Sequence, residues 1–155
     1  MNVQQKNNEK GFTIIEVVLV LAIAGLIFLM VFIALPSLQR GQRDAQRKTD
    51  LSRALTKVSD YQSNNRNSLP TNWADFATKY LKAGNDTFVD PSGTDYAFVA
   101  RDTSEVTGAF EAEQGKVYYT TGATCGDDGK VTAAGGRKVA LRMKLEGGGV
   151  ACSSN

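Results

Sequence analysis

The apolar residues of this chain are concentrated in one run near the N-terminus. Residues 17–35, nineteen in all, are apolar or glycine. At a helical rise of ~1.5 Å per residue the run would be ~29 Å long, which is the hydrocarbon thickness of a bilayer. It is too long for the core of a cleaved secretory signal, and no small-residue cut site follows it. The run predicts a membrane-spanning helix with one carboxylate, Glu16, at its edge, where an acid is costly and usually functional.

An amphipathic helical pattern follows the apolar run. Its apolar residues recur three, four, seven and ten positions after the first, which places them on one helix face: Leu51, Ala54, Leu55, Val58 and Tyr61. Neither glycine nor proline occurs in residues 42–67, and an asparagine-rich segment before Pro70 ends the pattern. We expect one long helix from Phe12 to about Asn64, with a kink at Pro36.

The rest of the chain predicts a short helix and several strands. Residues 72–81 predict a helix with Thr71 or Asn72 as N-cap, whose buried face consists of Trp73, Phe76, Ala77 and Tyr80. Alternating apolar and polar positions predict strands at residues 95–101, 116–121 and 137–145, with a weaker candidate at 109–113. The expected fold class is α+β: a long N-terminal helix, apolar in its first half and amphipathic in its second, packed against a C-terminal antiparallel sheet of three or four strands.

Composition narrows the chemistry that the chain can perform. The chain has 155 residues and no histidine, which excludes a Ser-His-Asp triad, a Cys-His nucleophile and zinc sites with imidazole ligands. Its net charge is only +2, and a protein that neutralises phosphates would be more basic. Six cations lie in residues 36–60: Arg40, Arg43, Arg47 and Lys48 come first after the apolar run, and Arg53 and Lys57 come later. We interpret them as a solvated helix face, with contact to anionic lipid as the alternative. No catalytic residue, metal or cofactor is expected.

The two cysteines lie near the C-terminus. Cys125 and Cys152 flank a glycine-rich segment, and a disulfide between them would stabilise the C-terminal region by roughly 3–4 kcal/mol. Two free buried thiols are the alternative. A catalytic or metal-binding pair has little support, because the spacing is not that of a Cys-x-x-Cys motif and the chain has no histidine.

Residues 10–16, Lys-Gly-Phe-Thr-Ile-Ile-Glu, resemble the class III signal of type IV pilins and pseudopilins. The likeness lies in a short charged leader, Gly11 before the cut, Phe12 after it, and Glu16 just ahead of an unbroken apolar run. The resemblance implies that a prepilin peptidase cuts between Gly11 and Phe12 and that Phe12 is then N-methylated. It also implies an assembly role for Glu16. In a filament core its carboxylate could pair with the N-terminal amine of a neighbouring subunit, and because that pair forms only in the assembled state it could set the register. The alternative is that the Glu16 side chain only extends to the membrane interface.

The same resemblance divides the chain into four parts. Residues 1–11 are the leader, 12–35 the membrane-spanning and filament-core helix, 36–64 its amphipathic continuation, and 65–155 the globular pilin head. The implied partners are copies of the chain itself, the prepilin peptidase, the pilus assembly ATPase with its platform, and membrane lipid. The charge pattern does not indicate a nucleic-acid partner.

The implied location is the cytoplasmic membrane for the precursor, with its N-terminus inside, and an extracellular pilus after assembly. The basic residues argue the other way, because the leader contains only Lys6 and Lys10 while four cations follow the apolar run. We give more weight to the leader motif and to the cysteine pair, which suggests an oxidising compartment.

The sequence therefore favours a structural subunit of a type IV pilus-like surface filament, without enzymatic activity. Two alternatives stay open. The first is a pseudopilin of a type II secretion or DNA-uptake apparatus. The second is a membrane-tethered enzyme or ligand-binding head, for which the apolar helix serves only as an anchor.

Overall fold

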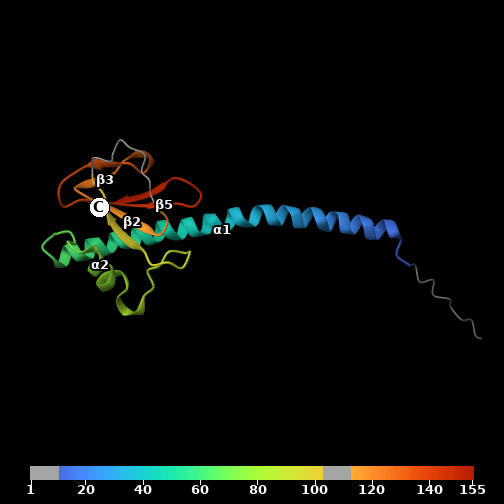
Figure 1. Ribbon diagram of the computed structural model, residues 1–155, viewed down its shortest axis with the longest axis horizontal. Helices are drawn as coiled ribbons and strands as arrows, with labels where there is room; N and C mark the ends of the chain where they lie inside the picture. The colour runs from blue at the N-terminus through green and yellow to red at the C-terminus, as the bar shows by residue number, and fades with distance from the viewer. Residues whose placement is uncertain (1–10, 103–112) are drawn as a thin grey trace, which may run out of the picture. The chain divides into compact units, whose positions relative to one another are not determined.

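The computed structural model describes residues 11–102 and 113–155 (Figure 1). Most of the predicted leader and the weak strand candidate at 109–113, except its last residue, lie outside the described residues. The chain divides into two compact units, Met1–Leu38 and Gln39–Asn155. Each unit is described by itself below.

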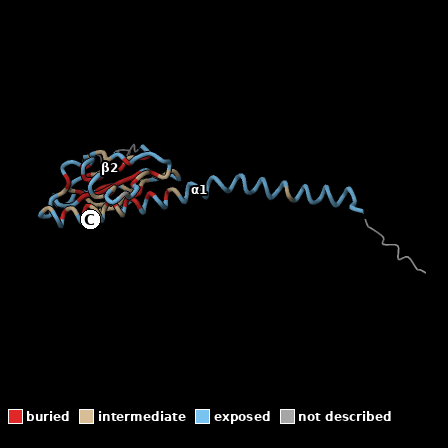
Figure 2. Tube along the Cα trace, turned by 90° about the horizontal axis from the view of Figure 1, so that it is seen from below, coloured by how far each residue is buried: buried red, intermediate tan, exposed pale blue. Residues whose placement is uncertain are grey.

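The long N-terminal helix is present. Helix α1 (Ile14–Asn64) has 51 residues and includes Pro36, so the predicted span is confirmed with a start two residues later than expected. The kink at Pro36 stays a prediction. Along the first unit the side chains of α1 are almost all exposed, and buried positions begin within the second unit (Figure 2). The change in burial follows the change from an apolar to an amphipathic pattern.

The second unit begins with the amphipathic part of α1. Leu51, Ala54 and Val58 are buried, as the periodicity predicts. The predicted short helix is also present, as an α-helical turn α2 (Trp73–Phe76) continued by a π-helical turn η1 (Ala77–Leu81). The Asn72 side chain accepts hydrogen bonds from the first backbone N–H groups of α2, which confirms it as the N-cap. A 3-10 turn, η2 (Ala83–Asn85), follows.

Four strands form the main sheet, in the order β1–β2–β5–β6. They are β1 (Ala97–Ala100), β2 (Lys116–Thr121), β5 (Val139–Lys144) and β6 (Val150–Ser154). The pairs β2–β5 and β5–β6 are antiparallel, but β1 pairs with β2 in parallel. The expectation of a wholly antiparallel sheet is therefore wrong at β1. A long connection, residues 101–115, returns the chain to the start of the neighbouring strand, which is what a parallel pair requires.

A small hairpin that the sequence did not predict covers part of the main sheet. Strands β3 (Ala123–Cys125) and β4 (Val131–Ala133) are joined across a 3-10 turn, η4 (Asp127–Gly129). Ala123 and Val131 pack against Ala140 of β5. Alternate β5 residues, namely Val139, Leu141 and Met143, share the other core with α1. The main sheet thus lies between the helix on one face and the hairpin on the other.

Aromatic residues from the short helix, the main sheet and α1 form one connected group. Trp73 stacks on Tyr119 of β2 with 4.2 Å between ring centroids, and it also stacks on Phe98 of β1. Phe76 contacts Trp73 and, edge-on, Tyr61 of α1. These contacts fix the short helix to both the sheet and α1, so the interpretation of its aromatic face as core is confirmed.

Candidate functional site

The residues next to the predicted cut site precede the helix. Gly11, Phe12 and Thr13 have no helical assignment and are exposed, Phe12 to 91%. A Cβ built on Gly11 would meet no atom within 4 Å. No neighbouring atom therefore crowds the side-chain position of Gly11.

The side chain of Glu16 turns back to the start of the helix. The backbone N–H and the hydroxyl of Thr13 both donate to its Oε2, at 2.8 Å each. The backbone N–H of Glu16 in turn lies 3.4 Å from the Thr13 hydroxyl oxygen. This reciprocal arrangement is a capping box. The Glu16 carboxylate thus has partners within its own chain. Its pairing with the amine of a neighbouring subunit and its role in assembly stay predictions.

The apolar residues after Glu16 are exposed on every side of α1. The exposed fractions of the large ones among residues 17–35 run from 44% at Leu35 to 76% at Met30. Within the part of the chain that the structure describes, α1 is the one helix long and apolar enough to cross a membrane, by length and composition.

Residues 6–32 match the family model of the prokaryotic N-terminal methylation motif. The motif is the class III signal peptide of type IV pilins and pseudopilins. The N-terminal part of this chain is therefore similar to that of type IV pilin-like and pseudopilin precursors, and the apolar helix beside the motif suggests a membrane-anchored precursor. The match ends within the apolar run, before the head begins. Comparison with curated proteins and with solved structures gave no match to this chain.

A buried arginine links the head to α1. The Arg47 side chain is fully buried and binds Asp90 through two hydrogen bonds, Nε to Oδ2 at 2.7 Å and Nη2 to Oδ1 at 2.8 Å. It also donates to Asp44, one turn earlier in α1, at 3.0 Å, and to Glu146 at 3.1 Å. Arg47 therefore joins the helix to two segments that are far away in sequence.

The turn between β5 and β6 is held at the same place. Arg43 binds the Glu146 carboxylate at 2.7 Å. Asp44 accepts the backbone N–H groups of Glu146 and Gly147, at 2.8 and 2.7 Å. The interpretation of the basic residues after the apolar run as a solvated face is thus wrong for Arg43 and Arg47. The mixed charges of residues 43–47 were the sequence feature that could have indicated ion pairs. The two remote partners, Asp90 and Glu146, lie in loops without a recognisable sequence pattern.

The electrostatics of this cluster favour its charged state. Burial raises the pKa of Asp90, but the hydrogen bonds from Arg47 and Ser92 outweigh burial and lower that pKa to about 2. Burial likewise opposes ionisation of Asp44, yet the two backbone N–H groups and Arg47 leave its pKa lowered. The hydrogen bond from Arg43, assisted by one from Arg47, lowers the pKa of Glu146.

Asp50 shows the opposite behaviour one turn further along α1. Burial raises its pKa, although the Tyr96 hydroxyl donates a hydrogen bond to it at 3.1 Å. Neither Arg47 nor Arg53 forms an ion pair with Asp50 among the described residues. A buried carboxylate without a cation directly on it gains less from ionisation than Asp90 does.

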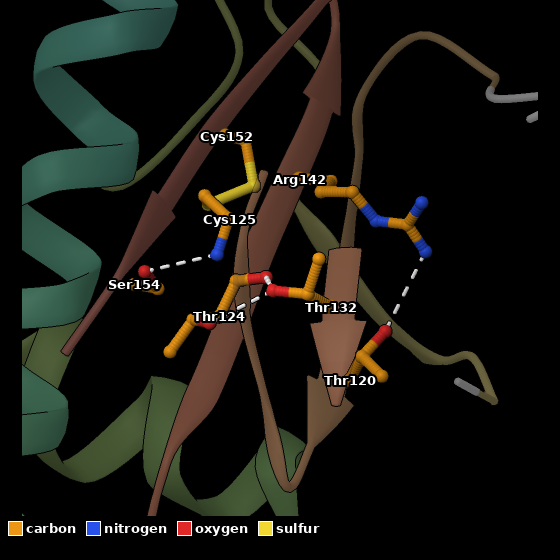
Figure 3. The surroundings of a disulfide bond; sticks show 7 residues. All are labelled: Thr120, Thr124, Cys125, Thr132, Arg142, Cys152 and Ser154. Carbon is orange, nitrogen blue, oxygen red and sulfur yellow. Dashed lines mark hydrogen bonds between the residues drawn. A yellow bond between two sulfur atoms is a disulfide. The ribbon is translucent and has the colours of Figure 1, made fainter. Parts of the chain in front are cut away.

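The predicted disulfide is present and joins the hairpin to the edge of the main sheet (Figure 3). Cys125 ends β3, and Cys152 lies in β6, 27 residues later. The backbone N–H of Cys125 also donates to the Ser154 hydroxyl at 3.1 Å. Both cysteines pack against the small core beneath the hairpin. The bridge therefore holds β6, the last strand of the chain, to the hairpin.

Replacing Arg47 tests whether this cluster holds the head together. In Arg47→Ala the free energy of unfolding should fall by about 3–5 kcal/mol, because Asp90 would stay buried without its cation. The matched control is Lys48→Ala, whose exposed neighbouring side chain should contribute within about 0.5 kcal/mol. Trp73 is the single tryptophan and is buried in the core, so its fluorescence during urea unfolding in detergent measures both variants. A loss below about 1 kcal/mol for Arg47→Ala would contradict the account.

The pKa of Asp90 predicts an acid-labile head. Because the folded value of about 2 lies below the ordinary 3.8, the unfolded chain binds a proton first as pH falls. The stabilisation, of order 2 kcal/mol, is complete above about pH 4 and is lost as pH falls towards 2. Asp44 and Glu146 act in the same direction, and Asp50 in the opposite one. Unfolding free energies measured from pH 6 to 2 should fall less steeply in Asp90→Asn than in the wild type. Equal slopes would refute the assignment.

Proposed function

We propose that this chain is the structural subunit of a type IV pilus-like surface filament. A precursor is inserted in the cytoplasmic membrane, cut after Gly11, methylated on the amine of Phe12, and polymerised through the apolar half of α1. The observation that carries the proposal is the position of the methylation motif, which ends in a helix whose apolar side chains are exposed on every face.

A helix that is apolar all round must be covered by lipid or by protein. Lipid covers it in the precursor, since the run has the length of a bilayer. Copies of the same helix would cover it in a filament. Because each helix would be surrounded by others, its apolar residues need not be confined to one face. A simple anchor explains the first state but gives no reason for a processing motif directly before the span.

The proposed location of the head is outside the cytoplasm. The disulfide between Cys125 and Cys152 supports it, because such bonds persist in oxidising compartments.

We propose that the work of the head is structural rather than enzymatic. The charged groups of the Arg47 cluster are used in joining α1 to the loop that contains Asp90 and to the β5–β6 turn. Their role is thus to keep the head in one conformation on the helix that enters the filament.

The assembly role of Glu16 is tested by removing its charge while keeping its hydrogen-bonding shape. Glu16→Gln retains the capping box, since glutamine serves at that position as well as glutamate. We expect it to be inserted and cut like the wild type but to yield filaments at least about tenfold less often, because the neighbouring amine loses its counter-charge. Electron microscopy and shearing of surface filaments measure the yield in the native host.

The control for this experiment is Asp60→Asn, which removes an exposed carboxylate that is paired with Lys57. It should assemble normally. Normal filaments from Glu16→Gln would contradict the register hypothesis. Wild-type protein that stays in the membrane without long filaments would contradict the pilus subunit and favour a pseudopilin or an anchored head.

A further inference from the structure

The capping box lies two residues after the bond that the motif marks for cleavage. We infer that Thr13, together with Glu16, fixes where α1 begins and so keeps the Gly11–Phe12 bond outside the helix, in the extended form that a peptidase can bind. Thr13 is thus a positioning residue for processing. The inference rests on the proposed function, since it assumes that cleavage occurs after Gly11.

The geometry makes Thr13 the N-cap and Glu16 the third helical residue. The first backbone bond of the helix runs from the N–H of Val17 to the carbonyl oxygen of Thr13, at 3.4 Å. The N–H of Glu16 donates to the Thr13 hydroxyl oxygen, and the N–H of Thr13 donates to the Glu16 carboxylate. Side chains thereby accept hydrogen bonds from backbone N–H groups at both ends of the first turn, so the helix has a defined start.

A defined start matters because helical peptide bonds are poor protease substrates. Their N–H and C=O groups are engaged within the helix, and cleavage requires local opening. Gly11 and Phe12 have no helical assignment, and both are exposed. Phe12 and Val17 occupy the two positions that a hydrophobic staple joins, the residue before the N-cap and the fourth helical residue. Both line one apolar groove, although the Phe12 side chain is 91% exposed.

Without the Thr13 hydroxyl the next available cap is Gly11 itself. Glycine is an acceptable N-cap and alanine a poor one, while alanine is the best residue inside a helix. In Thr13→Ala the helix would therefore extend by two residues to Gly11. Phe12 would enter the first turn, and the bond to be cut would become part of the helix end.

The box survives cleavage, because Thr13 and Glu16 both remain in the mature chain. The new amine of Phe12 would then lie one residue outside the helix, where a methyltransferase can approach it. The same two hydrogen bonds also supply Glu16 with partners between cleavage and assembly, when no neighbouring subunit is present.

The test compares four full-length precursors, the wild type and three variants, in detergent micelles with purified prepilin peptidase. Thr13→Ala should be cut about fivefold more slowly than the wild type, since that ratio corresponds to the loss of a typical capping residue. Thr13→Ser keeps the hydroxyl and should restore the wild-type rate. Thr49→Ala removes an exposed threonine hydroxyl that donates to the Ala45 carbonyl within α1, and it should have no effect.

A second measurement reads the helix start without the peptidase. Backbone chemical shifts of the uncut precursor should place Phe12 outside the helix in the wild type and in Thr13→Ser, and inside it in Thr13→Ala. Equal cleavage rates for Thr13→Ala and wild type would overturn the inference and leave the proposed function standing. Equal slowing by alanine and serine would also overturn it, because the peptidase would then recognise the threonine methyl group. A wild-type precursor that is not cut would overturn the proposed function, while the shifts would still decide the capping.

Discussion

The structure depends on the need to cover nineteen consecutive apolar positions that project from all sides of one helix. Water cannot be the final environment of such a surface, since roughly 25 cal/mol is lost for every square ångström left exposed. A bilayer satisfies the constraint for a single chain, and a bundle of identical helices satisfies it for many. The methylation motif at residues 6–32 includes the start of this apolar helix. A chain that leaves the bilayer for a bundle of helices would be processed at that end.

The second half of α1 meets the opposite requirement, because it must carry a head in water. Apolar packing provides the contact at Leu51, Ala54 and Val58. Nearer to the apolar run the contact becomes ionic, through Arg47 and its three carboxylate partners. Arg47 is worth little as a stabiliser compared with an apolar side chain of its size, but it is costly to remove. Its directional bonds specify which two loops lie on the helix.

Local pattern was sufficient for the elements with strong periodicity. The extent of α1, the cap at Asn72 and the span of β2 could be predicted because each depends on neighbouring residues. The hairpin strands could not, since each has three residues in a glycine-rich region and is held by tertiary contacts and the disulfide. The parallel pairing of β1 with β2 depends on the crossover connection between these two strands, and no local sequence pattern encodes it.

The candidate site divides in the same way. Gly11, Phe12 and Glu16 could be found from their order along the chain. That Glu16 has a partner in its own chain, Thr13, became known only from the distances between the two side chains. The Arg47 cluster was missed because Asp90 and Glu146 are 43 and 99 residues away from it. Ion pairs of that separation arise from the fold and leave no mark in a local window.

The mature N-terminus tests the central claim most directly. The protein is isolated from membranes and surface material of its native host, and its N-terminal peptide is identified by mass spectrometry. The account predicts a chain that begins at Phe12 and carries a methyl group on its amine, with residues 1–11 absent. A chain that retains those residues in both fractions would contradict it, because the apolar helix would then be a permanent anchor.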